Sequence, residues 1–401
     1  MTARAGLTWR QAMAWRVRRQ HLDDRAPRAA TLDVVTVLGG LHAQLFSSAE
    51  LSLWNRVDGL AAGDVDRAAW QQRALVKTWA MRGTLHLLPT SEYPLVQAAL
   101  NTYEHYLKPV WLRNFGVSRD ELELLIATVG QALDGPPLTR TELADEVARR
   151  TGSAKLGDKL RQSWGVFLKP ASFRGQLCFA SSSGQNVRFT RPDRWLPPLP
   201  GSAPPAGTSP GPVPEPVAVV REAAVAEVTR RYLAAYGPAT RADFARWWGV
   251  TPARAGALLA GLGDEATQVE VEGVRAWLLA AHVAELAGAA PSRSVRLLPA
   301  FDPYVIAASR DVPALLAGDV RDRVYRQQGW ISPVLLVNGR MDGVWSHERK
   351  GARLAVRIEP FVALPAWARR AAEAEAERLA GFLGGALELT WAACPPFQPR
   401  R

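Results

Sequence analysis

The sequence feature that most constrains the fold is a short pattern that occurs three times: helical segments followed by a two-stranded hairpin. The first hairpin is expected at residues 76–88, where β-forming residues flank the central pair Arg82–Gly83. A second is expected at 177–190 and a third at 266–279, each with a glycine in its turn. Three copies of one order of elements constrain the fold far more than a single copy does.

The helices before these hairpins carry their own start signals. The first helix is predicted from Thr8 to Gln20, with Thr8 as its N-cap. Thr139 and Glu142 have capping-box spacing, and a further helix is expected at 158–168. Thr251 precedes a proline at the first helical position of another helix. Because helix, helix and hairpin are the elements of a winged helix, the sequence predicts three tandem winged-helix units.

The division of the chain follows from a proline-rich segment and a change of pattern. Nine of the 29 prolines fall between Pro197 and Pro216, which is typical of an extended linker. The last ~110 residues indicate an α+β region with the hairpin turn Asn338–Gly339 and a closing helix at 366–382. The expected parts are winged helix 1 with the candidate catalytic motif at 1–115, winged helix 2 at 116–196, the linker at 197–217, winged helix 3 at 218–290, and the C-terminal α+β domain at 291–401.

Composition narrows the class of partner. The chain has 49 Lys and Arg against 38 Asp and Glu, and the resulting charge of +11 indicates a polyanion as partner. Cys178 and Cys394 lie far apart and lack the spacing of a zinc ribbon or a disulfide framework, which fits a reducing cytoplasm. No apolar run approaches the ~20 residues of a membrane helix, so no membrane partner is expected.

One short segment carries possible chemistry. The sequence lacks the phosphate-binding loop, the zinc-protease motif and the nucleophile elbow, and its six histidines are scattered, so neither a metal nor a cofactor is expected. His42 and Gln44 follow Gly39–Gly40 and lie two residues apart, so an extended backbone would direct both side chains to one side. Together they could hold and polarise one water molecule. A histidine at such a place is more often structural, and this reading stays open on the residues alone.

Four segments resemble the winged-helix DNA glycosylases related to AlkZ and YcaQ, and they occur in the same order along the chain. They are LHAQLFSSAELSLWNR at 41–56, WAMRGTLHLLP at 79–89, LLPAFDPYVI at 297–306 and VLLVNGRMDGVW at 334–345. The resemblance implies three winged helices and a β-rich C-terminal part that form a C-shaped, basic channel for duplex DNA. It also implies a monofunctional glycosylase without a cofactor.

The motif His42-Ala43-Gln44 departs from the Gln–apolar–Gln of AlkZ-type enzymes and the Gln–apolar–Asp of YcaQ-type enzymes. It resembles the His–apolar–Gln branch, which is associated with self-resistance to intercalating, guanine-alkylating natural products. The resemblance therefore implies that bulky N7-alkylguanine is released from double-stranded DNA. Such a base is cationic and leaves readily, so Gln44 would orient the water while His42 assists as a base or a second orienting group. A bulky adduct does not fit a base-flipping pocket, so attack is expected within the duplex.

Basic residues near the predicted turns are the candidates for DNA contact. Arg82 and Thr84 are expected at the tip of the first hairpin, and Arg340 beside the Asn338–Gly339 turn, so either hairpin could enter the minor groove. Arg349 and Lys350 follow the hairpin with the Asn338–Gly339 turn and could bind phosphate. Any one of these arginines could equally be a solvated residue.

Two other functions stay open on the sequence. A winged-helix transcription regulator would also bind DNA, although three units in one chain and the lack of a heptad segment for dimerisation argue against it. A non-catalytic protein that binds damaged DNA or the drug is the second alternative. A monomer is expected because three units already span a DNA site.

Overall fold

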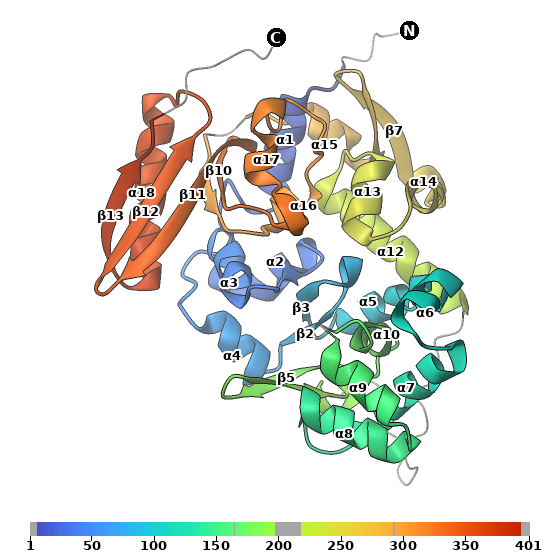
Figure 1. The fold of residues 1–401 in the computed structure, drawn as a ribbon. Coiled ribbons are helices and arrows are strands. Elements are labelled where there is room, and N and C mark those ends of the chain that lie inside the picture. Colours follow the sequence, from blue (N-terminus) through green and yellow to red (C-terminus); the bar gives the residue numbers. More distant parts are fainter. Residues whose placement is uncertain (1–5, 164, 197–217, 292, 394–401) are drawn as a thin grey trace. The chain divides into compact units, whose positions relative to one another are not determined.

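The computed structural model describes residues 6–163, 165–196, 218–291 and 293–393. It is an α+β protein, as predicted, and it divides into two compact units (Figure 1). Unit 1 combines Met1–Asp64 with Thr229–Arg401, and unit 2 is Val65–Val228. The predicted linker and Cys394 lie outside the described residues, and the finer division into five parts stays a prediction. No helix among the described residues is long and apolar enough to cross a membrane.

Unit 1 begins with the predicted first helix, whose capping box is formed by Thr8 and Gln11. Its helices include α1 (Trp9–Arg19), α2 (Thr31–Val37), α3 (Phe46–Trp54), α13 (Arg241–Trp248), α14 (Pro252–Ala260), α15 (Val283–Ala287), α16 (Pro303–Ala307), α17 (Arg321–Val324) and α18 (Ala366–Leu383). Between them lie the short strand β1 (Leu41–His42) and the predicted hairpin of β7 (Ala266–Val271) and β8 (Val274–Leu279). The helix α12 (Ala218–Tyr236) runs from unit 2 into unit 1.

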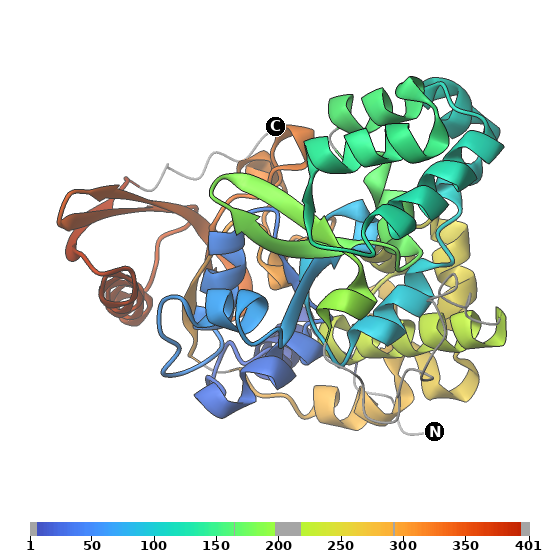
Figure 2. The ribbon, with the colours of Figure 1, turned by 90° about the horizontal axis from the view of Figure 1, so that it is seen from below.

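The C-terminal half of unit 1 contains a five-stranded sheet in the order β13-β12-β11-β10-β9. Its strands are β9 (Val295–Leu298), β10 (Val334–Val337), β11 (Arg340–Lys350), β12 (Arg353–Pro360) and β13 (Ala386–Trp391). The first four pair antiparallel, and the predicted Asn338–Gly339 turn joins β10 to β11. Strand β13 runs parallel to β12, because α18 packs on one face of the sheet and returns the chain in the same direction (Figures 1 and 2).

Unit 2 is mostly helical. Its helices include α4 (Asp64–Trp70, which starts at the last residue of unit 1's first segment), α5 (Tyr93–Leu100), α6 (Pro109–Phe115), α7 (Arg119–Ala132), α8 (Arg140–Thr151), α9 (Ala154–Gln162), α10 (Leu168–Phe173) and α11 (Pro192–Trp195). The strands are β2 (Leu75–Trp79), β3 (Leu85–Pro89), β4 (Leu138–Thr139), β5 (Cys178–Ser183) and β6 (Asn186–Thr190). The first two predicted hairpins are thereby confirmed, as β2–β3 and β5–β6.

One predicted helix is wrong in its bounds. The segment 158–168 is not one helix: α9 ends at Gln162 and α10 begins at Leu168. Ser163 is extended at φ −87° and ψ 139°, and Gly165 follows at φ +88°. A left-handed glycine cannot continue an α-helix, so the chain turns between the two helices.

Candidate active site

The His42–Gln44 motif lies in unit 1, where the chain leaves α2 and enters β1. Gly39 and Gly40 have φ of +68° and +106°, so only residues without a Cβ adopt this turn easily. His42 is 5 % exposed, whereas Gln44 is exposed. The motif therefore joins a buried ring to an accessible amide over two positions.

The imidazole of His42 has an aromatic neighbour from a distant part of the chain. It stacks on Phe301, with ring centroids 4.7 Å apart and an interplanar angle of 19°. Phe301 has φ +59°, a conformation that costs a non-glycine residue on the order of 1–3 kcal/mol. The ring of Phe301 also meets that of Trp330 edge-to-face at 5.0 Å. The contact with Phe301 restricts the ring orientations that His42 can adopt.

A buried ion pair fixes the segments on both sides of this contact. Arg56, just after α3, donates to both carboxylate oxygens of Asp302 at 2.7 Å, and both side chains are fully buried. Asp302 also caps α16, because its carboxylate accepts from the amide of Tyr304. The neighbouring Asn55 donates to the Leu297 carbonyl at the end of β9. These bonds tie the helix after His42–Gln44 to the turn that carries Phe301.

The Asn338–Gly339 turn is enclosed by its own chain. A Cβ at Gly339 would lie 2.7 Å from the Met13 Cβ, and the Tyr304 hydroxyl donates to the Gly339 carbonyl at 2.7 Å. Gly339 thus packs against α1, while Asn338 and Arg340 on either side of it are half-buried. Beside it, the Arg340 Nε lies 3.1 Å from the Asp342 carboxylate. Burial raises the pKa of Asp342 to about 6, although the charge of Arg340 acts in the opposite direction.

Arg349 and Lys350 lie at the exposed end of β11, where Gly351 turns the chain into β12. Arg349 donates to the carbonyls of Leu383 and Gly384 at 2.6 and 2.8 Å, so it satisfies the C-terminal end of α18. Lys350 lies 3.2 Å from an exposed Glu348 carboxylate. Arg349 and Lys350, which are adjacent in the sequence, therefore differ. The guanidinium of Arg349 bonds to the end of α18, whereas the ammonium of Lys350 pairs with an exposed carboxylate.

Arg82 and Thr84 belong to unit 2, in the turn between β2 and β3. Both are half-buried, and Arg82 has φ +59°. The Thr84 hydroxyl donates to the Met81 carbonyl and so closes the turn. Gly83 packs beside Lys169: a Cβ at Gly83 would meet the Lys169 side chain at 3.4 Å. Lys169 is therefore a second basic side chain beside the turn that carries Arg82, and burial lowers the pKa of its ammonium group.

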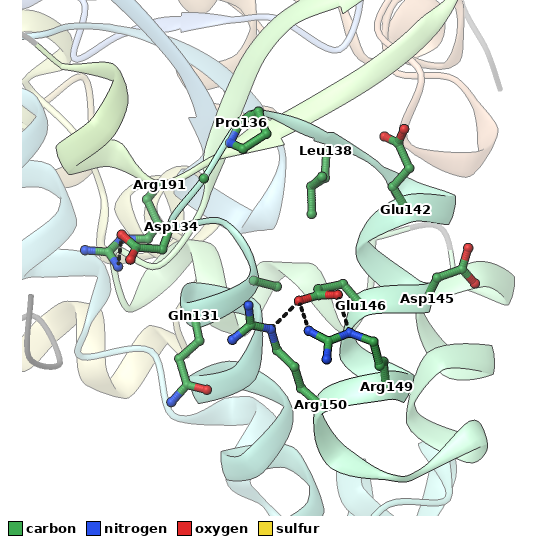
Figure 3. A pocket seen from close by; sticks show the side chains of 12 residues that line it. Gln131, Asp134, Pro136, Leu138, Glu142, Asp145, Glu146, Arg149, Arg150 and Arg191 are labelled. Carbon is green, nitrogen blue, oxygen red and sulfur yellow. Dashed lines mark hydrogen bonds and ion pairs between the residues drawn. The ribbon is translucent and has the colours of Figure 1, made fainter.

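Unit 2 also contains a hollow of about 870 Å³ beside α8 (Figure 3). Its carboxylates face arginines: Glu146 accepts from Arg149 and Arg150, and Asp134 accepts from Arg191. Hydrogen bonds from the two arginines lower the pKa of Glu146 to about 2. A carboxylate held ionised by its neighbours is a poor general acid near neutral pH, so Glu146 is not suited to that role.

No metal site accompanies the motif. In the part of the chain that the structure describes, no three His, Cys, Asp or Glu side chains gather as metal ligands.

Two residues near the motif, Phe301 and Trp330, were not predicted from the sequence. Phe301 lay within a segment already noted, and its contact with His42 joins two segments that no local pattern connects.

Comparison with known proteins gives consistent results. The family model described as DNA glycosylase AlkZ-like matches residues 35–382. A protein of Streptomyces sahachiroi, named interstrand DNA cross-link repair glycosylase, is 39% identical over 342 residues, which are 84% of this chain and 87% of that protein. The solved structure of the Streptomyces sahachiroi DNA glycosylase AlkZ has a TM-score of 0.82 and 35% identity, covering 96% of this chain and 100% of that one.

Proposed function

The chain belongs to the AlkZ-like DNA glycosylase family, and we propose that it releases bulky N7-alkylguanine from duplex DNA with His42 and Gln44 at the reacting centre. It is a DNA glycosylase, so the regulator that the sequence left open is set aside. The observation that carries the proposal is the motif itself, which joins a buried imidazole stacked on Phe301 to an exposed amide.

The chemistry follows from the leaving group. Alkylation at N7 makes guanine cationic, so the glycosidic bond breaks with little help from a general acid. The enzyme then has to place a water molecule and stabilise a sugar with oxocarbenium character. Gln44 orients the water with its amide, and His42 acts as base or as a second orienting group. A pair without a carboxylate suffices only for such activated bases, so unmodified bases are not substrates.

The predicted architecture of three winged helices around a C-shaped channel forms part of the proposal. Helix pairs followed by a hairpin support it: α13 and α14 precede β7–β8, and α8 and α9 precede β5–β6. The proposed DNA contacts are Arg82, Thr84, Arg340 and Lys350. Arg349 is a fifth proposed contact, which it would make in addition to its bonds to the end of α18. A role in self-resistance to an intercalating alkylator, a monomeric state and a cytoplasmic location stay predictions.

Base release from a duplex with a single N7-alkylguanine tests the proposal. Wild-type protein should leave an abasic site, whereas His42→Ala and Gln44→Ala should bind the duplex and excise at least ~100-fold more slowly. The panel includes a cross-linked duplex, because the Streptomyces sahachiroi relative is named for cross-link repair. Binding without release from every N7 adduct by the wild type would favour the non-catalytic alternative.

A further inference from the structure

The three rings of His42, Phe301 and Trp330 form an aromatic stack that runs from the buried motif to the surface. His42 is 5 % exposed, Phe301 is half-buried and Trp330 is 42 % exposed. The outer contact is edge-to-face, with an interplanar angle of 73°, which is a favourable arrangement for two aromatic rings. An indole at the surface therefore lies two ring contacts from the imidazole of the motif.

The loop that carries Trp330 is held by backbone bonds. The amide of Arg326 donates to the Trp330 carbonyl at 2.8 Å, and the Trp330 amide donates back to Gln327 at 3.3 Å. Gln328 and Gly329 both have positive φ, at +57° and +75°. A left-handed pair of residues tightens this turn, and the strain at Gln328 requires surroundings that hold it. The backbone bonds and the left-handed pair thus restrict the positions that the Trp330 side chain can adopt.

The surroundings of this indole indicate what it contacts. Residues 326–330 are all exposed. The other side chains there are one arginine and two glutamines, so this loop has no apolar patch that would favour a protein partner. A net charge of +11 suits DNA. Aromatic side chains bind bases and other planar rings by stacking, which does not depend on the pattern of hydrogen-bonding groups.

We propose that Trp330 is a specificity-determining residue that stacks on the planar ring system of the adduct joined to N7. Undamaged bases in a duplex already stack on their neighbours, whereas an adduct ring that lies outside the base stack leaves a face free for the indole. Stacking on Trp330 would hold the lesion at the outer end of this aromatic stack, with Phe301 between the indole and the His42 ring of the motif. This inference rests on the proposed function and names the substrate class of the same site.

The experiment compares two duplexes, one with N7-methylguanine and one with an N7 adduct that bears a polycyclic aromatic group. Trp330→Leu removes the aromatic face and keeps an apolar side chain, while Trp330→Phe keeps a ring. Trp330→Leu should lose roughly tenfold in kcat/KM on the polycyclic adduct, mostly through KM, and less than about threefold on N7-methylguanine. Trp330→Phe should recover most of the loss.

Binding titrations with both duplexes supply a readout that does not depend on catalysis. An equal loss on the two duplexes, or no loss on the polycyclic one, overturns the role of Trp330 and leaves the proposed function intact. If the wild type excises neither base but Trp330→Leu binds the polycyclic duplex more weakly than the wild type, the contact of Trp330 is supported and the proposed reaction is contradicted.

Discussion

The surroundings of His42 in unit 1 and the hollow beside α8 in unit 2 use charge in opposite ways. Near His42 the charged groups are buried and structural, with the ion pair of Arg56 and Asp302 fully enclosed. In the hollow, Glu146 and its arginines are open to solvent and neutralise one another. The motif region has the exposed indole of Trp330 and the exposed amide of Gln44, whereas acidic and basic side chains line the hollow.

The comparison indicates that neither the volume of a cavity nor its number of charged groups predicts where the proposed reaction takes place. A base that is already cationic needs no strong acid, and a bulky lesion attacked within the duplex needs no deep pocket. What it needs is fixed geometry. Buried charges that hold backbone segments together supply that geometry better than exposed ones, because exposed pairs are screened and mobile.

The largest expected effect concerns the buried pair. Arg56→Ala leaves the buried carboxyl group of Asp302 without its ion-pair partner, so the free energy of unfolding should fall by about 3–5 kcal/mol. Chemical denaturation measures this, with Arg149→Ala in the hollow as the matched control that should leave the midpoint unchanged. Equal effects of the two substitutions would remove the distinction between a structural and a solvated pair.

The next effect concerns catalysis. Gln44→Ala should slow base excision at least ~100-fold, about 2.7 kcal/mol in the barrier, while Glu146→Gln should leave the rate as it is. Single-turnover base release from the N7-alkylguanine duplex measures both. A large loss in Glu146→Gln would move the chemistry to the hollow and contradict the assignment of the motif.

A smaller effect separates two carboxylates by the direction of their pH dependence. The pKa of Asp342 is raised from 3.8 to about 6, so its contribution to stability is complete below pH ~4 and is lost as the pH rises through 6. The loss is on the order of 3 kcal/mol and should vanish in Asp342→Asn. The pKa of Glu146 is lowered to about 2, so its small contribution is lost as the pH falls below 4.5.

Denaturation midpoints of wild type, Asp342→Asn and Glu146→Gln between pH 3 and 8 test this pair of predictions. Asp342→Asn should flatten the curve between pH 4 and 6, and Glu146→Gln should leave that range unchanged. The same change of stability between pH 4 and 6 in wild type and Asp342→Asn would contradict a raised pKa of Asp342 in the folded protein.

The smallest effect compares single surface cations. If Lys350 contacts one phosphate, Lys350→Ala should reduce the slope of log Kd against log salt by about 0.9. Arg149→Ala in the hollow should leave the slope unchanged, because its guanidinium is bonded to Glu146. Fluorescence anisotropy over a salt series gives the slope, and identical slopes for all three proteins would exclude a phosphate contact of Lys350.

The sequence predicted local features of the fold well and contacts between distant residues poorly. Hairpin turns such as Asn338–Gly339 and caps such as Thr139 depend on neighbouring residues, so the structure has them where they were expected. The bonds of Arg349 to α18 and the packing of Gly339 on Met13 join distant segments. No periodicity encodes such contacts, so the sequence indicated a phosphate contact for Arg349 and could not show that its guanidinium also bonds to the end of α18.

The candidate site shows the same limit. His42 and Gln44 could be singled out because they lie two residues apart after a pair of glycines. The strained backbone of Phe301 and its ring contacts depend on how β9 and α16 are joined, and the sequence there favours only a turn. The Arg56–Asp302 pair likewise needs two segments that meet only after folding.

Unit 1 is discontinuous along the chain, and this has a consequence for how the protein is made. The ribosome releases the His42–Gln44 motif early, then all of unit 2, and only afterwards the strands and turn that carry Phe301. Since domains complete their contacts as their residues emerge, a nascent chain can finish unit 2 while the motif still waits for its partner ring. Translation that stops between the two would leave a fragment with the motif in its sequence and no assembled centre to act on DNA.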